Sequence, residues 1–215
     1  MTRVIAGAAG GRRLRVPPGQ GTRPTSDRAR EGLFSSLLSE LGDLSGLRVL
    51  DLYAGSGAVG LEALSRGAAH VLLVESDPRA AAVARANIGA VALPGAVLAV
   101  DRVERLVSRA PDSGRYDLVF ADPPYAVPDT GVQAVLSLLG SGWLDDGALT
   151  VVERATRSGV FHWPPGYAAG KSRRYGEATF WYGWYGGGTE AGQAVQPRAA
   201  VPGSLPDAPR GAHEE

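Results

Sequence analysis

Residues 49–60, which read VLDLYAGSGAVG, constrain the fold of this chain more than any other stretch. Residues 47–52 are mostly apolar, as expected for a strand that is covered on both faces of a parallel sheet. Gly55 and Gly57 then remove Cβ atoms where the backbone must turn and a ligand must come close. Apolar residues at helical spacing follow. The stretch therefore predicts a strand, a glycine turn and a helix whose N-terminus points at a ligand.

The glycine spacing alone fits two classes of ligand. Gly55-x-Gly57-x-x-Gly60 matches both the dinucleotide fingerprint and the nucleoside-binding loop of methyltransferases. Asp51, at the end of the predicted strand, favours the second class. Its turn resembles the S-adenosylmethionine (SAM) loop of class I methyltransferases, where the acid faces the cationic methionine end of SAM. A pyrophosphate at the same place would be repelled by the carboxylate.

Composition excludes several other kinds of site. The chain of 215 residues is long enough for one sizeable domain. It has no cysteine, and its three histidines are far apart in the sequence, so neither a disulfide nor a cysteine or histidine metal cluster is expected. No apolar run approaches the ~20 residues of a membrane span, and the N-terminus lacks a hydrophobic signal region. We expect a cytoplasmic protein without a metal or a membrane partner.

Charge is unevenly distributed along the chain although the net charge is zero. Residues 1–30 contain one acid, Asp27, and seven arginines: Arg3, Arg12, Arg13, Arg15, Arg23, Arg28 and Arg30. Such a basic segment is typical of a nucleic-acid contact, and a solvated basic face is the other interpretation.

The order of predicted elements indicates an α/β fold. A basic β-hairpin (3–7 and 12–16), a polar connector (21–27) and a helix (27–41) precede the organising stretch. Strands near 47–53, 70–75, 96–100, 116–121 and 147–153 then alternate with helices near 58–66, 78–92, 102–109 and 129–140, which favours a mostly parallel sheet. We expect a Rossmann-like class I methyltransferase fold with an N-terminal β-hairpin.

The C-terminal part has a different character. Residues 159–163 and 173–185 are rich in β-formers and are expected to close the sheet edge as an antiparallel hairpin. Residues 186–215 are rich in Gly, Pro and Ala and are expected to form a disordered tail. The predicted units are the hairpin (1–20), a methyltransferase domain (21–185) and the tail (186–215).

A second motif, Asp122-Pro123-Pro124-Tyr125, follows the predicted strand 116–121. The prolines fix the backbone, so a carboxylate, a rigid carbonyl and an aromatic ring are held together at a strand end, where ligands bind in open α/β sheets. The motif resembles the catalytic motif of methyltransferases that act on exocyclic amines. Two acceptors, the Asp122 carboxylate and the Pro123 carbonyl, can hold the amine, and the Tyr125 ring can stack on a base removed from its helix.

Acids at the ends of the next two strands suit the rest of a nucleoside. Glu75 is placed for the ribose hydroxyls and Asp101 for the adenine amino group, although an acid at a strand end can also be only a helix cap. The residues expected to bind SAM are Asp51, Tyr53, Ala54, Gly55, Ser56, Gly57, Glu75, Ser76, Asp101, Arg102 and, from the connector, Thr25.

Three stretches together resemble the RsmD family of bacterial 16S rRNA guanine-N2 methyltransferases: residues 23–31, 50–67 and 117–125. The resemblance covers about residues 2–185, and Tyr125 departs from the phenylalanine expected in the family. It implies SAM-dependent methylation of the N2 amine of a guanine in 16S rRNA, free or within the small ribosomal subunit. The N-terminal arginines would then hold RNA phosphates, and the connector would close over SAM.

Other functions remain open at this point. A DNA adenine-N6 methyltransferase uses the same four-residue motif, but no stretch here is long enough for a separate DNA-reading domain. A protein-glutamine methyltransferase usually carries Asn at the position of Asp122. A nicotinamide-dependent oxidoreductase would leave the Asp-Pro-Pro-Tyr motif unexplained, and a non-catalytic RNA-binding module would have no need of Asp51 or Asp122.

Overall fold

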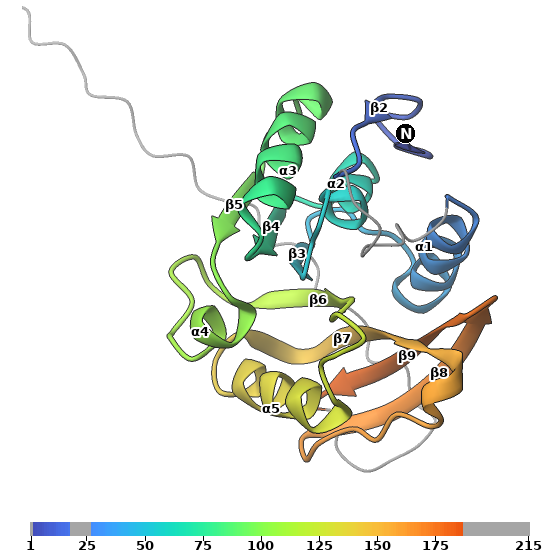
Figure 1. The fold of residues 1–215 in the computed structure, drawn as a ribbon, viewed down its shortest axis with the longest axis vertical. Helices are drawn as coiled ribbons and strands as arrows, with labels where there is room; N and C mark the ends of the chain where they lie inside the picture. The colour runs from blue at the N-terminus through green and yellow to red at the C-terminus, as the bar shows by residue number, and fades with distance from the viewer. Residues whose placement is uncertain (1, 18–26, 187–215) are drawn as a thin grey trace, which may run out of the picture.

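The protein is a three-layer α/β structure (Figure 1). It is a computed structural model that describes residues 2–17 and 27–186. The helices are α1 (Asp27–Leu41), α2 (Ala58–Ser65), α3 (Pro78–Val91), α4 (Val103–Val107) and α5 (Asp129–Gly140). The strands are β1 (Thr2–Arg3), β2 (Arg13–Leu14), β3 (Arg48–Leu52), β4 (His70–Glu75), β5 (Ala96–Val100), β6 (Tyr116–Ala121), β7 (Leu144–Ala155), β8 (Tyr167–Tyr175) and β9 (Ala178–Tyr185).

The central sheet has seven strands in the order β5-β4-β3-β6-β7-β9-β8. The first five are parallel, whereas β9 pairs antiparallel with both β7 and β8. The chain builds outward from β3 through β4 to β5 and then returns to place β6 on the other side of β3. Ligands bind at such a reversal of strand order, beside the carboxyl ends of the strands. The topology therefore locates the candidate site between β3 and β6.

Each face of the sheet carries its own apolar core, as strands covered on both faces require. One core joins α1, α2 and α3 to the sheet through residues such as Phe34, Leu61 and Phe180. The other joins α4 and α5 to the opposite face, through residues such as Val107 and Leu136. Figure 1 shows these two helical layers on either side of the sheet. The packing of both layers fixes the positions of the parallel strand ends.

The predicted elements and the mostly parallel sheet are confirmed, with differences at the C-terminus. Residues 159–163 form no strand, and the hairpin is built from β8 and β9 instead. The exposed strand β8 forms the edge of the sheet, and β9 lies between β8 and β7. The predicted tail lies outside the described residues, apart from Gly186. Among the described residues, no helix combines the length and the apolar character that crossing a bilayer requires.

The N-terminal hairpin is joined to α2 by a buried polar network. The fully buried Glu62 carboxylate accepts hydrogen bonds from the backbone amides of Ile5 (2.7 Å) and Ala6 (3.0 Å) and from Arg66 Nε (2.7 Å). The Ser65 hydroxyl accepts from the Ala9 amide and donates to the Ala6 carbonyl. Because every one of these groups is partnered, the hairpin has a fixed position on the domain.

Arg30 belongs to the same network, which corrects its predicted role. Its side chain is 1% exposed, donates to the Arg3 carbonyl, and lies 3.1 Å from Asp27 and 3.8 Å from Glu62. In helix α1 it lies one turn before Leu33 and Phe34, on the buried face. The prediction that Arg30 contacts RNA phosphates is therefore wrong, because its guanidinium is enclosed by protein.

Candidate active site

Four acids lie on one face of the sheet near the carboxyl ends of four neighbouring strands. Side chains alternate along a strand, so Glu75, Asp51, Asp122 and Glu153 all point to the face that carries α1, α2 and α3. In sheet order they belong to β4, β3, the end of β6, and β7. The parallel registers place Asp51 deepest, beside Phe120, and bring Asp122 level with Glu153.

Asp51 is a buried carboxylate at the base of this row. It is 1% exposed, and its Oδ2 accepts a hydrogen bond of 2.8 Å from the Gly60 amide of α2. Burial raises the pKa of Asp51 to about 7, and the nearby charge of Glu75 contributes to the increase. Without a bound cation, the carboxylate is therefore held in an environment that disfavours its charge.

The loop that follows β3 has the backbone geometry that its sequence predicts. Gly55 and Gly57 have φ angles of 55° and 76°, and Tyr53 has a φ of 59°, which is costly for a residue with a side chain. The Gly55 amide donates to Glu75 Oε2 at 2.7 Å. A Cβ built on Gly55 would meet no protein atom within 4 Å, whereas one on Gly57 would meet Leu73. One side of the loop is thus packed and the other is open.

The Asp-Pro-Pro-Tyr motif turns away from the end of β6. Burial raises the pKa of Asp122 well above its usual range, and the charges of Glu153 and Asp51 add to this effect. Pro123 is buried, while Tyr125 is 57% exposed. The Pro124 carbonyl accepts from the Val127 amide at 2.8 Å, which closes the turn. The motif thus places a carboxyl group inside the site and an aromatic ring at its mouth.

The residues predicted for the adenosine end lie farther along the same edge. Glu75 Oε1 accepts from the Asp77 amide at 2.7 Å, so both of its oxygens are oriented by backbone donors. Asp101 Oδ1 accepts from the Arg102 amide (2.7 Å) and from Arg105 Nε (2.6 Å), and the bond from Arg105 lowers the pKa of Asp101. Ser76 and Arg102 are exposed beside these acids. Thr25 lies outside the described residues.

The remaining N-terminal arginines differ in their surroundings. Arg12 Nη1 donates to the carbonyls of Ala90 and Val91, both at 2.8 Å, and so caps the C-terminus of α3. Arg23 lies outside the described residues. The arginines with exposed side chains and no such helix-capping bond are Arg3, Arg13, Arg15 and Arg28.

Two buried polar residues beside the site were not predicted from the sequence. Asn87 of α3 donates to the carbonyls of Ser56 (2.9 Å) and Arg15 (3.0 Å) and accepts from the Arg15 amide (2.8 Å), so it ties the glycine loop to the end of the hairpin. Glu153 is 7% exposed. An acid at an inward position of the apolar run 148–155 was the signal that could have identified Glu153.

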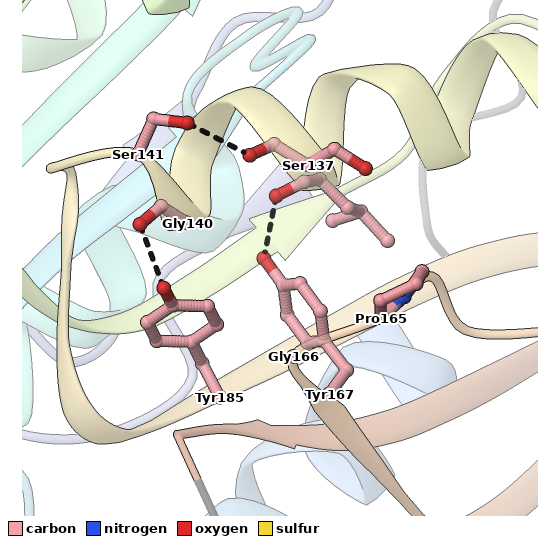
Figure 2. Close-up of a pocket in the computed structure, with 8 residues that line it drawn as sticks. Ser137, Gly140, Ser141, Pro165, Gly166, Tyr167 and Tyr185 are labelled. Atoms are coloured by element: carbon pink, nitrogen blue, oxygen red, sulfur yellow. Dashed lines mark hydrogen bonds between the residues drawn. The ribbon is translucent and has the colours of Figure 1, made fainter.

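A pocket of about 310 Å³ lies elsewhere, between the C-terminal end of α5 and the outer strands (Figure 2). Its tyrosines are committed to structure, since the Tyr167 and Tyr185 hydroxyls donate to the carbonyls of Leu136 (2.9 Å) and Gly140 (2.7 Å). The end of α5 leads into the start of β7, so this pocket is at the amino edge of the parallel strands. It lies at the edge opposite the row of acids and contains none of them.

The row of acids fits SAM better than a dinucleotide. A cationic sulfonium and ammonium group would be stabilised by Asp51 and its acidic neighbours, which would repel a pyrophosphate. The open side of Gly55 leaves room for a ligand, and Glu75 presents acceptors for a ribose diol. Within the described residues, no three acidic, histidine or cysteine side chains are grouped to hold a metal ion.

The position of Glu75 leads to a first prediction. Glu75→Ala should weaken SAM binding by about 1.5–3 kcal/mol, because a charged acceptor for the ribose is lost together with the partner of the Gly55 amide. Glu75→Gln retains an acceptor oxygen for that amide, so its affinity for SAM should decrease less than that of Glu75→Ala. Titration calorimetry with SAM measures both variants, and unchanged affinity in Glu75→Ala would exclude this residue from the site.

Comparisons with known proteins agree with this geometry. The family model described as conserved hypothetical protein 95 matches residues 2–184. Ribosomal RNA small subunit methyltransferase D of Escherichia coli K12 is 34% identical over 180 residues, which are 83% of this chain and 87% of that protein. The protein of the same name from Haemophilus influenzae is 35% identical over 153 residues, covering 70% of this chain and 77% of that protein.

Solved structures share the same architecture. The Escherichia coli protein yhhF superposes with a TM-score of 0.74 at 30% identity and covers 85% of this chain and 97% of its own. Magnesium protoporphyrin IX methyltransferase from Synechocystis, solved with bound SAM, has a TM-score of 0.58 at 18% identity over 74% of this chain and 78% of that one. At that identity the second likeness shows only that the fold is shared.

Proposed function

Because the chain belongs to the methyltransferase family described as conserved hypothetical protein 95, we propose that it transfers a methyl group from SAM to small-subunit rRNA. The relatives named ribosomal RNA small subunit methyltransferase D support this substrate. The acceptor that we propose is the exocyclic N2 amine of a guanine in 16S rRNA. We propose that the reaction takes place in the cytoplasm.

One observation carries the proposal: Asp122 of the Asp-Pro-Pro-Tyr motif lies next to the end of β3, where we propose that SAM binds. Asp51 lies in β3 and Asp122 directly follows β6, the two strands on either side of the strand-order reversal, and the charge of Asp51 acts on Asp122. An amine held by Asp122 would therefore be adjacent to the methionine end of SAM. A glycine loop without this second acid would be compatible with many nucleotide-binding proteins.

The residues of the motif explain how such an amine could react. The amine of guanine is a poor nucleophile, because its lone pair is delocalised into the ring. Asp122 and the Pro123 carbonyl would accept hydrogen bonds from the two N–H groups of the amine. These bonds would turn the lone pair out of conjugation and stabilise the positive charge that develops on nitrogen. When bound, SAM supplies the methyl group from its sulfonium sulfur.

Proton removal is the second contribution of Asp122. Once the nitrogen has formed its bond to the methyl carbon, it must lose one proton. A carboxylate whose pKa is raised by burial and by neighbouring acids holds a proton more strongly than an exposed carboxylate does. Asp122 is therefore suited to take that proton and release it to water after the product leaves. The exposed Tyr125 ring would stack on the displaced base.

The proposed reaction can be tested directly in cells. The rRNA of a strain that lacks this protein should lose one N2-methylguanosine, and the purified protein with SAM should restore it. Nuclease digestion and mass spectrometry identify the modified nucleoside and its position. N6-methyladenine in DNA as the main product would overturn the RNA substrate while preserving the role of the Asp-Pro-Pro-Tyr motif.

We further propose that the exposed arginines of the hairpin hold RNA phosphates. Replacing Arg3, Arg13 and Arg15 with alanine should weaken RNA binding and reduce the slope of log affinity against log salt by roughly 0.7–0.9 for each phosphate that is no longer neutralised. SAM binding should be unchanged. Arg12→Ala is the matched control, because that guanidinium caps α3. A salt slope equal to that of the unaltered protein would show that the three arginines form only a solvated face.

A further inference from the structure

Glu153 is the acid of the row that the proposed reaction has not yet used. Strand β7 runs parallel to β6, and the pairing of Ala121 with Val152 brings Asp122 level with Glu153. Both side chains point to the same face, above the buried Phe120 and Val151. Glu153 is 7% exposed, and its charge acts on Asp122. Two carboxyl groups therefore lie side by side on neighbouring strands.

The order of the strands assigns Glu153 to the side of the target base. The glycine loop, Asp51 and Glu75 belong to β3 and β4, on one side of Asp122. Glu153 belongs to β7, on the other side. A cofactor held by β3 and β4 therefore approaches Asp122 from one direction, and the ring that carries the reacting amine extends in the other. The edge of that ring would meet Glu153.

The charge of this region also favours a partner that donates hydrogen bonds. Asp51 and Glu153 are buried acids and Asp122 is a partly buried one, while Arg154 is the cation whose charge acts on Asp122. Arg154 donates to the Val127 carbonyl at 2.9 Å and lies 2.8 Å from Asp129, so it fixes the segment after the motif. Each carboxylate oxygen can accept more than one hydrogen bond, so this group of acids suits a ligand edge that donates N–H groups.

Guanine and adenine present opposite patterns at the relevant edge. Beside its N2 amine, guanine carries the N1–H donor, whereas the ring nitrogen beside the N6 amine of adenine is an acceptor. Two adjacent carboxylates match two adjacent donors and oppose an acceptor. We propose that Glu153 is a specificity-determining residue that accepts the N1–H of the target guanine while Asp122 holds its N2 amine. This inference rests on the proposed function.

The experiment replaces guanine with a base that has an acceptor at N1. This base also lacks O6, so the preference is compared between variants that differ only at Glu153. Small-subunit rRNA would carry either guanine or 2-aminopurine at the mapped position, since 2-aminopurine keeps the N2 amine but has an acceptor at N1. The unaltered protein should prefer guanine in kcat/KM by about tenfold or more, as expected when a matched donor is replaced by an acceptor. In Glu153→Gln the preference should fall at least about tenfold, because the amide of glutamine can donate to N1.

Comparing the ratio between variants removes the intrinsic reactivity of the two bases. Glu153→Ala should lose activity on guanine while keeping most of its activity on 2-aminopurine, and Glu40→Gln, on the distant helix α1, should leave the ratio unchanged. An equal loss on both bases in Glu153→Gln and Glu153→Ala would overturn the inference and leave Glu153 a structural residue. Absence of N2-methylguanosine with the unaltered protein would instead overturn the proposed function.

Discussion

Replacing Asp122 with alanine is expected to slow single-turnover methyl transfer by ~10²–10³-fold, as found when one preorganised polar partner of a transition state is removed. The carboxylate would hold the amine, stabilise its developing charge and take its proton, and the neighbouring Pro123 carbonyl cannot replace the last two roles. Affinity for SAM should be nearly unchanged, because most of the residues that we propose for cofactor binding lie at the ends of β3, β4 and β5. Rapid-quench transfer of labelled methyl groups to rRNA measures the rate, and calorimetry measures the affinity.

Asp122→Asn separates these roles. Its amide oxygen can still accept one N–H from the base, but the side chain can no longer take a proton, so its rate should fall between those of the unaltered protein and Asp122→Ala. Retention of full activity by Asp122→Ala on any substrate would contradict both the proposed mechanism and the assignment of the motif. Equal losses of SAM affinity and rate would instead indicate a disturbed fold.

Replacing Asp51 with asparagine is expected to have two opposite effects. The pKa of Asp51 is about 7 in the folded protein and near 3.8 without the fold. The folded state therefore binds the proton more tightly, and its stability decreases as pH rises from about 4 to about 7 and is constant above that range. At ~1.4 kcal/mol per unit, the ionised carboxylate costs up to about 4 kcal/mol at alkaline pH. Asp51→Asn removes this cost and retains an acceptor for the Gly60 amide.

The same substitution should weaken SAM binding by roughly 2–4 kcal/mol, because a buried partner of a cation is lost. In the unaltered protein, SAM affinity should decline by about tenfold per pH unit below about 7, as Asp51 takes up its proton. In Asp51→Asn this decline should be absent. Thermal unfolding and calorimetry across pH test both effects. A variant that binds SAM with unchanged affinity and unchanged pH dependence would place Asp51 outside the cofactor site.

The parallel part of the fold was predictable because its strands are covered on both faces. Residues 70–75 and 116–121 read as apolar runs, and the strands β4 and β6 have these same bounds. Strand β8 was missed because it is an exposed edge strand whose middle is polar and glycine-containing, so it carries no alternating apolar signal. The irregular segment 159–163 has β-forming residues, yet Phe161 packs into the core without a strand partner.

The candidate site was predicted only where local motifs define it. Asp51 and Asp122 are recognisable from the residues beside them. Glu153 is defined by its register with β6, which no local pattern reveals. Arg30 was predicted to lie at the surface. Its burial depends on Glu62 of helix α2, which is far from Arg30 in the sequence, so no local pattern reveals it. Pairings between distant segments thus account for the residues that sequence reasoning placed wrongly or did not notice.

The buried carboxylate of Glu62 has a consequence for how the N-terminal hairpin, here called the arm, can be gained or lost in evolution. A chain that began after residue 17 would keep Glu62 and Arg66 but lose the Ile5 and Ala6 amides that orient the buried charge. Each lost hydrogen bond to this charged group costs about 1.5–3 kcal/mol, and the two together are a large share of the stability of a domain. The arm is therefore not a detachable module. An exchange of arms between relatives would succeed only if the matching side chains of α2 were exchanged with them.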